Sequence, residues 1–318
     1  MVEPAEDTSR NGMRKEATVS LTRAPRLTRP RLIILAAVLA IAGLFAAISQ
    51  TAAAQAARGH DTRAGAASST GQAKPTIVLE HGAFADASSW NGVIQRLQDD
   101  GYTVYAPPDP LRGVAYDSQT LADFLATIHG PVVLAGHSYG GVVITNAATG
   151  DKHVKALVYV DGYIPAQGET AFGLTTAQPG SCLNANPATV FNFASYPGAP
   201  SGDSDAYLKV TPDGTYPGFA GCLANGVPAS RAAILAATQR PIAFSAFSEP
   251  SGPPAWKTIP SWAVIGTADH AIPPAELLFM AHRAHAHITK VSAGHLSLIT
   301  NPGAVARVII GAADATTG

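Results

Sequence analysis

Residues 131–141, PVVLAGHSYGG, decide how the rest of this sequence is interpreted. An apolar run leads into one serine with a glycine two residues away on each side, which is the pattern of a nucleophile elbow. Such an elbow is a tight turn between a strand and a helix, and it needs glycines where neighbouring chain approaches closely. We therefore predict a strand over 131–135, a helix over 142–148 and Ser138 as a nucleophile. A chance occurrence of this pattern in a glycine-rich loop is the alternative.

Short apolar runs alternate with segments of helical periodicity on both sides of the elbow. Strands are predicted over 76–80, 102–106, 131–135, 155–160, 261–266 and 287–291. Helices are predicted from about 89 to 100, 118 to 129, 142 to 148, 229 to 238 and 275 to 286, and from Asn301 onward. This alternation predicts an α/β fold, in which helices cover both faces of a mostly parallel sheet. In such sheets, functional side chains gather at the carboxyl ends of the strands.

Acidic and imidazole side chains follow three of the other predicted strand ends. Asp161 and Asp269 come directly after two strands, and His295 lies on a loop beyond the last strand. A histidine can activate a serine hydroxyl as general base, and a carboxylate can hold that histidine in the required tautomer. We expect Asp269 to be this carboxylate, because it precedes His295 by one helix and one strand. Asp161 is the alternative acid, and is otherwise expected to shape the chain that follows it.

The loop at residues 81–84, HGAF, follows the first predicted strand, where its glycine would let backbone N–H groups face a ligand. We predict an oxyanion hole made by the backbone N–H groups of Ala83 and of Tyr139, the residue after the elbow serine. Phe84 is a substitute for Ala83 as the donor.

Between residues 163 and 256 the alternation is lost, and Pro, Gly, Ser and Ala become frequent. We interpret this segment as a cap inserted into the α/β domain, which is expected to span residues 75–318. Both cysteines of the chain, Cys182 and Cys222, lie in it. In an exported protein they are expected to form a disulfide, worth about 3 to 4 kcal/mol by chain entropy. Two buried free thiols are the alternative.

The first 56 residues have the composition of an export signal. A lead-in with six basic residues between 14 and 31 precedes 17 uncharged, mostly apolar residues at 32–48, and Ala54-Gln55-Ala56 offers a cleavage site. We predict a cleaved signal at 1–56, a flexible leader at 57–74 and a secreted enzyme. An uncleaved membrane anchor is the alternative, and it also places the rest of the chain outside the cytoplasm.

Composition argues against several classes of function. The chain has 21 Lys and Arg against 22 Asp and Glu, and no basic stripe, so we expect no nucleic-acid partner. His282, His285 and His287 lack carboxylate or cysteine partners at ligand spacing, so we expect no metal and no cofactor. His137, inside the elbow, is expected to serve packing.

The chain order Ser138, Asp269, His295 resembles the α/β-hydrolase superfamily, and the resemblance extends over residues 76–313. Within it, four motifs together are similar to the branch of small bacterial esterases, plant methylesterases and hydroxynitrile lyases: HGAF at 81–84 with Trp90, GHSYGG at 136–141, GTADH at 266–270 and AGH at 293–295. The lyases have a threonine where this chain has Gly82, and a lysine where it has Leu296.

The resemblance therefore implies hydrolysis of a small-molecule carboxylic ester through a Ser-His-Asp triad and an acyl-enzyme. Dehalogenases and epoxide hydrolases of the superfamily carry aspartate at the elbow, so Ser138 argues against their reactions. Glu80 departs from the family pattern, which has an apolar residue at the end of this strand. Amide hydrolysis, perhydrolysis and a non-catalytic binding role on the same fold remain alternatives.

Overall fold

The computed structural model describes residues 74–211 and 218–316, which belong to one compact unit, Gly71–Gly318. The predicted signal or anchor at 1–56, and the leader up to residue 73, lie outside the described residues. None of the helices in the described ranges is long and apolar enough to cross a membrane.

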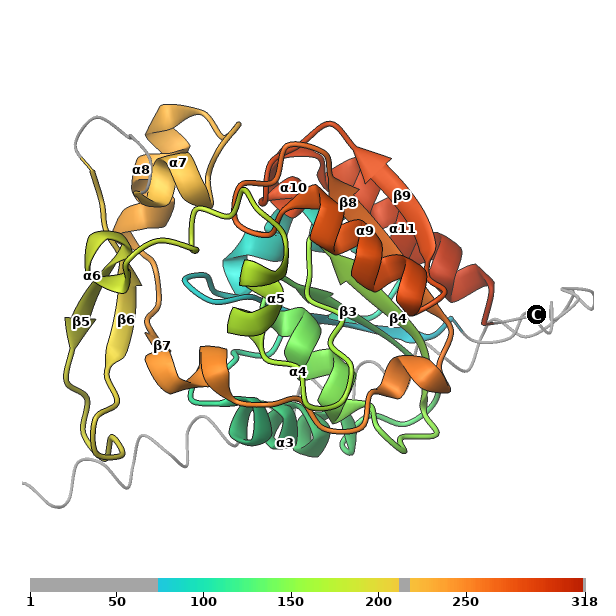
Figure 1. Cartoon of the computed structure of the whole chain (residues 1–318). Helices are drawn as coiled ribbons and strands as arrows, with labels where there is room; N and C mark the ends of the chain where they lie inside the picture. The colour runs from blue at the N-terminus through green and yellow to red at the C-terminus, as the bar shows by residue number, and fades with distance from the viewer. Residues whose placement is uncertain (1–73, 212–217, 317–318) are drawn as a thin grey trace, which may run out of the picture. The chain divides into compact units, whose positions relative to one another are not determined.

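A sheet of six parallel strands forms the centre of this unit, in the order β2-β1-β3-β4-β8-β9 (Figure 1). Its strands are β1 Thr76–Glu80, β2 Val104–Tyr105, β3 Val132–His137, β4 Val154–Val160, β8 Ser261–Gly266 and β9 His287–Val291. Every residue of β3 is buried, because the sheet is covered on both faces. The predicted α/β fold with a mostly parallel sheet is confirmed.

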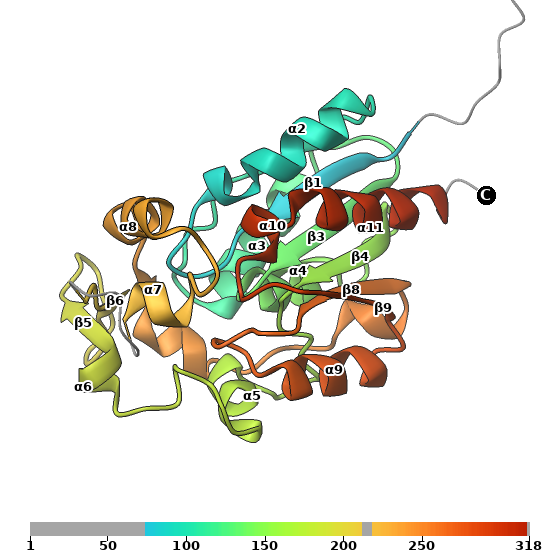
Figure 2. The ribbon, with the colours of Figure 1, turned by 90° about the horizontal axis from the view of Figure 1, so that it is seen from above.

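Helices pack against both faces of the sheet (Figures 1 and 2). On one face, α2 and α11 lie side by side, and on the other face lie α3, α4 and α9. Their bounds are α2 Asn91–Asp99, α3 Val114–Leu125, α4 Gly140–Ala147, α9 Pro274–Arg283 and α11 Pro302–Asp314; the short helices η1 Ala87–Trp90 and α10 Ser297–Thr300 precede α2 and α11. Val305, Ile309 and Ala312 share one face of α11 and are buried.

The chain between β4 and β8 forms a separate layer of structure, and we call its residues 163–256 the insert. Its elements are α5 Ala171–Ala177, α6 Pro187–Val190, β5 Phe191–Ala194, β6 Asp205–Leu208, α7 Phe219–Cys222, α8 Ala229–Ala237, β7 Ile242–Ala243, η2 Phe244–Ser248 and η3 Ala255–Lys257. Strands β5, β6 and β7 pair as an antiparallel sheet that the sequence did not predict, because strands of two to four residues are too short to display an alternating pattern.

The predicted disulfide between Cys182 and Cys222 is confirmed, with their Cα atoms 5.6 Å apart. It joins the chain after α5 to the end of α7.

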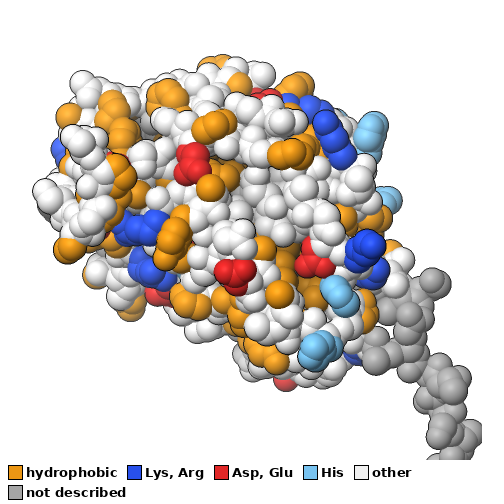
Figure 3. Space-filling view, turned by 90° about the horizontal axis from the view of Figure 1, so that it is seen from below, with side chains coloured by type: hydrophobic (Ala, Val, Ile, Leu, Met, Phe, Trp, Pro, Cys, Tyr) orange, Lys and Arg blue, Asp and Glu red, His pale blue; other side chains and the backbone are white. Residues whose placement is uncertain are grey.

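On the face of the molecule in Figure 3, acidic and basic side chains stand singly or in small groups among apolar ones.

The order of the strands determines where loops meet. From β1 the chain moves outward to β2 and then returns to the other side of β1 as β3. The loops after β1 and β3 therefore leave the sheet in opposite directions, and this switch point is where α/β sheets place their ligands. The loop at 81–84 and the serine turn meet there.

Candidate active site

The turn after β3 has the strained backbone that the sequence predicts for an elbow. Ser138 has a φ of 53°, in the left-handed region that non-glycine residues rarely adopt. A Cβ on Gly136 would lie 2.5 Å from the carbonyl oxygen of Gly140, so only glycine permits this turn. The N–H of Ser138 donates to the Val160 carbonyl oxygen at 3.3 Å. The turn thus presents the serine hydroxyl at the carboxyl edge of the sheet.

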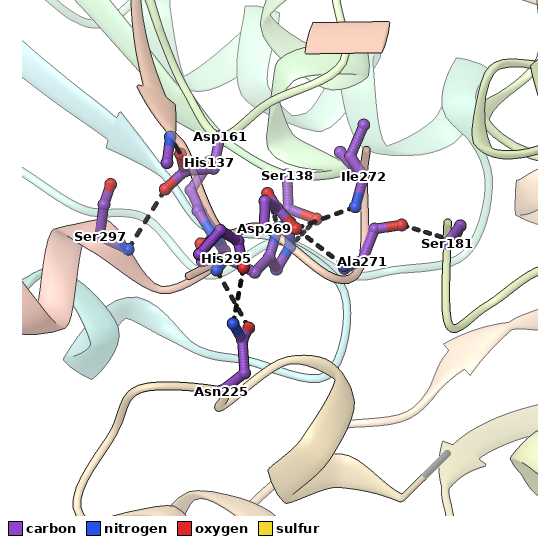
Figure 4. A network of polar contacts seen from close by, with 12 residues as sticks. His137, Ser138, Asp161, Ser181, Asn225, Asp269, Ala271, Ile272, His295 and Ser297 are labelled. Atoms are coloured by element: carbon purple, nitrogen blue, oxygen red, sulfur yellow. Dashed lines mark hydrogen bonds and ion pairs between the residues drawn. The ribbon is translucent and has the colours of Figure 1, made fainter. Parts of the chain in front are cut away.

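Ser138, His295 and Asp269 form a continuous chain of hydrogen bonds (Figure 4). Ser138 Oγ lies 2.9 Å from His295 Nε2, and His295 Nδ1 lies 2.8 Å from Asp269 Oδ2. The other carboxylate oxygen, Oδ1, accepts from the N–H groups of Ala271 at 2.7 Å and Ile272 at 3.0 Å. Because a carboxylate only accepts, Nδ1 carries the proton and Nε2 is left to accept from the serine hydroxyl.

All three side chains are shielded from solvent, with exposed fractions of 8% for Ser138, 1% for His295 and 3% for Asp269. Burial by itself lowers the pKa of His295, but the negative charge of Asp269, its hydrogen bond and the charge of Asp161 outweigh burial and raise this pKa. The site therefore favours an imidazole that readily accepts a proton.

The structure brings Asp269, and not Asp161, to the imidazole of His295. Asp161 is buried, and its two oxygens accept from the N–H groups of Gly266 at 2.6 Å and Ser297 at 3.2 Å. Burial, followed by the charge of Asp269, raises the pKa of Asp161 to about 7. Asp161 thus ties the end of β8 to the start of α10, immediately beside the histidine loop.

The two predicted oxyanion donors lie on loops that touch. A Cβ on Gly82 would be 2.7 Å from Ser138 Cβ, so the 81–84 loop runs directly against the elbow. Within the described ranges, the backbone N–H groups of Ala83 and Tyr139 donate no hydrogen bond to the protein, and neither does that of Phe84. The Tyr139 hydroxyl donates to Asp117 Oδ2 at 2.9 Å, which fixes this residue on the buried side of the turn.

His137 has a role that sequence reasoning missed. Its Nε2–H donates to the carbonyl oxygen of His295 at 3.0 Å, and the two rings are 4.8 Å apart. Burial, together with any charge on His295, lowers the pKa of His137 well below its usual value, so the ring is neutral. The only signal in the sequence is its position next to the elbow serine.

Asn225 was also missed, and nothing in the sequence could have indicated it. It lies in the insert, after α7, and Figure 4 shows its side chain directed at the loops of Asp269 and His295. Its Nδ2 donates to the carbonyl oxygen of Ala268 at 2.7 Å.

A group of buried acids lies behind the elbow. Glu80 is 2% exposed, so the end of β1 is dry despite the acidic residue. Burial and the nearby Asp109 raise the pKa of Glu80 well above its usual value. Burial and the charge of Asp117 raise the pKa of Asp109 to about 7. His81 Nε2 accepts from the Asp109 N–H at 3.0 Å and is therefore neutral.

Apolar side chains surround the space beside the elbow. A cavity of about 30 Å³ is lined by residues that include Ala83, Phe84, His137, Leu223, Leu296 and Ile299. The ring of Phe84 stacks on Phe191 and Phe247 of the insert, at 5.9 and 6.1 Å between centroids. Sheet edge and insert together thus make an apolar pocket.

The described residues contain no group of three or more His, Cys, Asp and Glu side chains arranged to hold a metal ion. His282, His285 and His287 are exposed.

Comparisons with known proteins identify the family to which this fold belongs. Residues 77–308 match the model of the alpha/beta hydrolase family. The alpha/beta hydrolase nvfD of Aspergillus novofumigatus is 26% identical over 261 residues, which cover 76% of this chain and 97% of the relative. Polyneuridine aldehyde esterase has a TM-score of 0.62 and 16% identity, covering 75% of this chain and 99% of its own. A pyrethroid hydrolase from Sphingobium faniae JZ-2 has a TM-score of 0.55 and 21% identity, covering 76% and 98%. These likenesses agree with the branch that the motifs suggested, and the chain belongs to the alpha/beta hydrolase family.

Proposed function

We propose that this protein is a serine hydrolase that cleaves carboxylic esters through an acyl-enzyme. The observation that carries the proposal is the buried chain of hydrogen bonds from Ser138 Oγ through His295 to Asp269. A serine hydroxyl is a weak nucleophile until a base accepts its proton, and this chain supplies that base.

In the first half of the reaction, His295 Nε2 takes the proton of Ser138 Oγ while the oxygen attacks the ester carbonyl carbon. Asp269 stabilises the resulting imidazolium. The N–H groups of Ala83 and Tyr139 bind the negative oxygen of the tetrahedral intermediate. The carbon–oxygen bond to the alcohol then breaks, and His295 gives its proton to the leaving alkoxide.

In the second half, His295 takes a proton from water as the water oxygen attacks the acyl carbon. Collapse of this intermediate breaks the bond to Ser138 Oγ, which recovers its proton from His295. The products are an acid and an alcohol, and no cofactor is needed.

Three observations support ester substrates in particular. Gly82 after the first histidine and Leu296 after the last agree with the esterases rather than the hydroxynitrile lyases of the similar branch, and serine at the elbow argues against the reactions of dehalogenases and epoxide hydrolases. Two of the similar proteins are named as an esterase and as a pyrethroid hydrolase. The walls of the pocket are mostly apolar, with Asp86 and hydroxyl side chains on part of the lining, and they favour an uncharged acyl or alcohol group.

The test is hydrolysis of p-nitrophenyl esters of graded acyl length. We expect hydrolysis by the wild type, and a fall in kcat of about 10⁴ or more in Ser138→Ala. Ser201→Ala, at an exposed serine of the insert, is the matched control and should keep full activity. Hydrolysis of anilides but not esters would replace the proposal by amide hydrolysis. Turnover of neither would favour a binding protein.

We also propose that the protein is exported and that its mature form begins near Ala57. The disulfide supports an oxidising compartment. Amino-terminal sequencing of protein from the culture medium tests this, and a full-length form retained in the membrane would establish the anchor instead.

A further inference from the structure

The disulfide lies beside the loop that carries Asp269. On the Cys182 side, the Cys182 N–H donates to the carbonyl oxygen of His270 at 2.8 Å. The hydroxyl of Ser181 donates to the carbonyl oxygen of Ala271 at 2.6 Å. The stretch of the insert at Ser181 and Cys182 is therefore bonded to the residues that follow Asp269.

The Cys222 side of the bridge holds the same loop from another direction. His270 Nδ1–H donates to the carbonyl oxygen of Gly221 at 3.1 Å. Three residues beyond Cys222, Asn225 Nδ2 donates to the carbonyl oxygen of Ala268, the residue before Asp269. The loop is thus bonded to the insert at residues 268, 270 and 271.

Asn225 reaches the histidine loop as well. Its Oδ1 accepts a long hydrogen bond of 3.5 Å from the His295 N–H. A Cβ on Gly294 would lie 2.3 Å from the Asn225 carbonyl oxygen and 2.5 Å from its side chain, so the two backbones are in contact. One amide side chain of the insert therefore touches both loops that meet in the His295–Asp269 hydrogen bond (Figure 4).

We propose that the Cys182–Cys222 disulfide and Asn225 are positioning elements that hold Asp269 against His295. The inference rests on the catalytic role proposed for these two residues. The disulfide joins the stretch of the insert around Cys182 to the stretch around Cys222. Both stretches are hydrogen-bonded to the Asp269 loop, so the bridge restrains that loop. Catalytic groups have to stay within about 0.5 Å of their productive positions, and a displacement of about 1 Å can cost 10²-fold in rate.

The variants that test this are Asn225→Ala and the double change Cys182→Ser with Cys222→Ser. Asn186→Ala is the matched control, because its side chain caps α6 in the insert without reaching the active-site loops. We expect kcat to fall at least about tenfold in the two test variants, with a smaller change in KM. We expect the acid limb of the kcat/KM profile to move to lower pH, because a weaker contact with Asp269 leaves burial to lower the pKa of His295.

A purely structural role would lower the melting temperature of all three variants but leave kcat per folded molecule and the acid limb unchanged, and this result would overturn the inference.

Reduction of the wild type is a second test, which does not depend on whether the variants fold. Added reductant should reproduce the loss in kcat, reoxidation should restore it, and the double serine variant should not respond. A reduced wild type that remains folded with unchanged kcat would also overturn the inference.

An NMR titration of the His295 ring separates this inference from the proposed function, since it needs no substrate. We expect a lower pKa for His295 in Asn225→Ala than in the wild type and Asn186→Ala. Equal pKa values in an enzyme that hydrolyses esters would support the proposed function and overturn the positioning role of Asn225. A shifted pKa in a protein that does not hydrolyse esters would support the positioning role and overturn the proposed function.

Discussion

Two buried aspartates lie within the same small region, and their hydrogen-bond partners give them different roles. Asp269 faces an imidazole nitrogen, whereas Asp161 faces two backbone N–H groups. Position after a strand made both of them candidates for the acid. Which of the two aspartates contacts the imidazole depends on the path of the loop that carries His295, and only the folded chain shows that path.

We predict that Asp269→Asn lowers kcat by about 10⁴, as loss of the triad acid does in serine proteases, because an amide would favour the wrong tautomer of His295. Asp161→Asn is the matched control. Its effect should fall on stability, by about 1 to 3 kcal/mol, because one amide oxygen cannot serve both N–H groups. Steady-state kinetics and chemical denaturation measure the two effects. The opposite pattern, with activity lost only in Asp161→Asn, would move the catalytic acid to that residue.

The raised pKa of His295 predicts the pH dependence of the reaction. The imidazole has to be neutral to accept the Ser138 proton, so activity appears only above its pKa. Because Asp269 and Asp161 raise that pKa despite burial, the acid limb of kcat/KM should lie above the usual histidine value of about 6.5. A limb at or below that value would show that the carboxylates do not act on this ring as described.

Among the elements, those bounded by local signals were predicted best. The bounds of β1, β8 and β9 agree residue for residue with the predicted strands. Helix α3 begins at Val114 rather than near Ser118, because Glu249 accepts from the N–H groups of Val114 at 2.7 Å and Ala115 at 2.9 Å. Glu249, which caps this helix, lies more than a hundred residues away in the chain. The sequence near Val114 therefore carries no pattern that indicates where the helix begins.

In the candidate site, too, the residues that lie in or beside a local sequence signal were the ones predicted correctly. Ser138 and the glycines around it form one contiguous motif, and Asp269 and His295 each follow a recognisable strand. His137 and Asn225 act through backbone carbonyl groups of distant loops. A carbonyl group is present at every residue, so no sequence pattern identifies which one will be bonded.

The elbow as an element depends on backbone contacts that only glycine allows. We predict that Gly141→Ala destabilises the protein by at least about 1 to 3 kcal/mol, because its Cβ would lie 2.3 Å from the carbonyl oxygen of Tyr163. Gly311→Ala in α11 is the control, since its Cβ meets no atom within 4 Å, and alanine there should stabilise by about 0.5 to 1 kcal/mol. Urea denaturation measures both. Equal stability of the two variants would contradict the packing described for the elbow.

At the scale of the whole molecule, several buried carboxyl groups bind protons more tightly in the folded than in the unfolded chain. The pKa values of Asp109 and Asp161 are raised to about 7, and that of Glu80 is raised well above its usual value. Between the usual carboxyl range and these raised values, the folded state holds protons that the unfolded state has lost. These groups therefore lower the free energy of unfolding as pH rises through that window. His81 and His137, with lowered pKa values, act in the opposite direction.

A variant comparison isolates one of these groups. We predict that Glu80→Gln gains stability relative to the wild type as pH rises from about 4.5 to 8, because glutamine cannot ionise in the buried site. Glu169→Gln is the control: partial burial raises the pKa of Glu169, but hydrogen bonds from Arg283 and the Ala166 N–H outweigh it and lower this pKa, so Glu169 titrates below the range and its difference from the wild type should stay constant from about pH 4.5 to 8. Melting temperatures across this pH range measure both differences. A constant difference between Glu80→Gln and the wild type would mean that Glu80 ionises freely.

The central claim, that Ser138 is a base-activated nucleophile, is tested most directly by a fluorophosphonate. Only a serine activated by a base beside oxyanion donors reacts readily with such a reagent. We predict one phosphonyl group per folded molecule, located by peptide mass spectrometry on Ser138, and no reaction in Ser138→Ala. An unreactive wild type, or the same modification persisting in Ser138→Ala, would contradict the account.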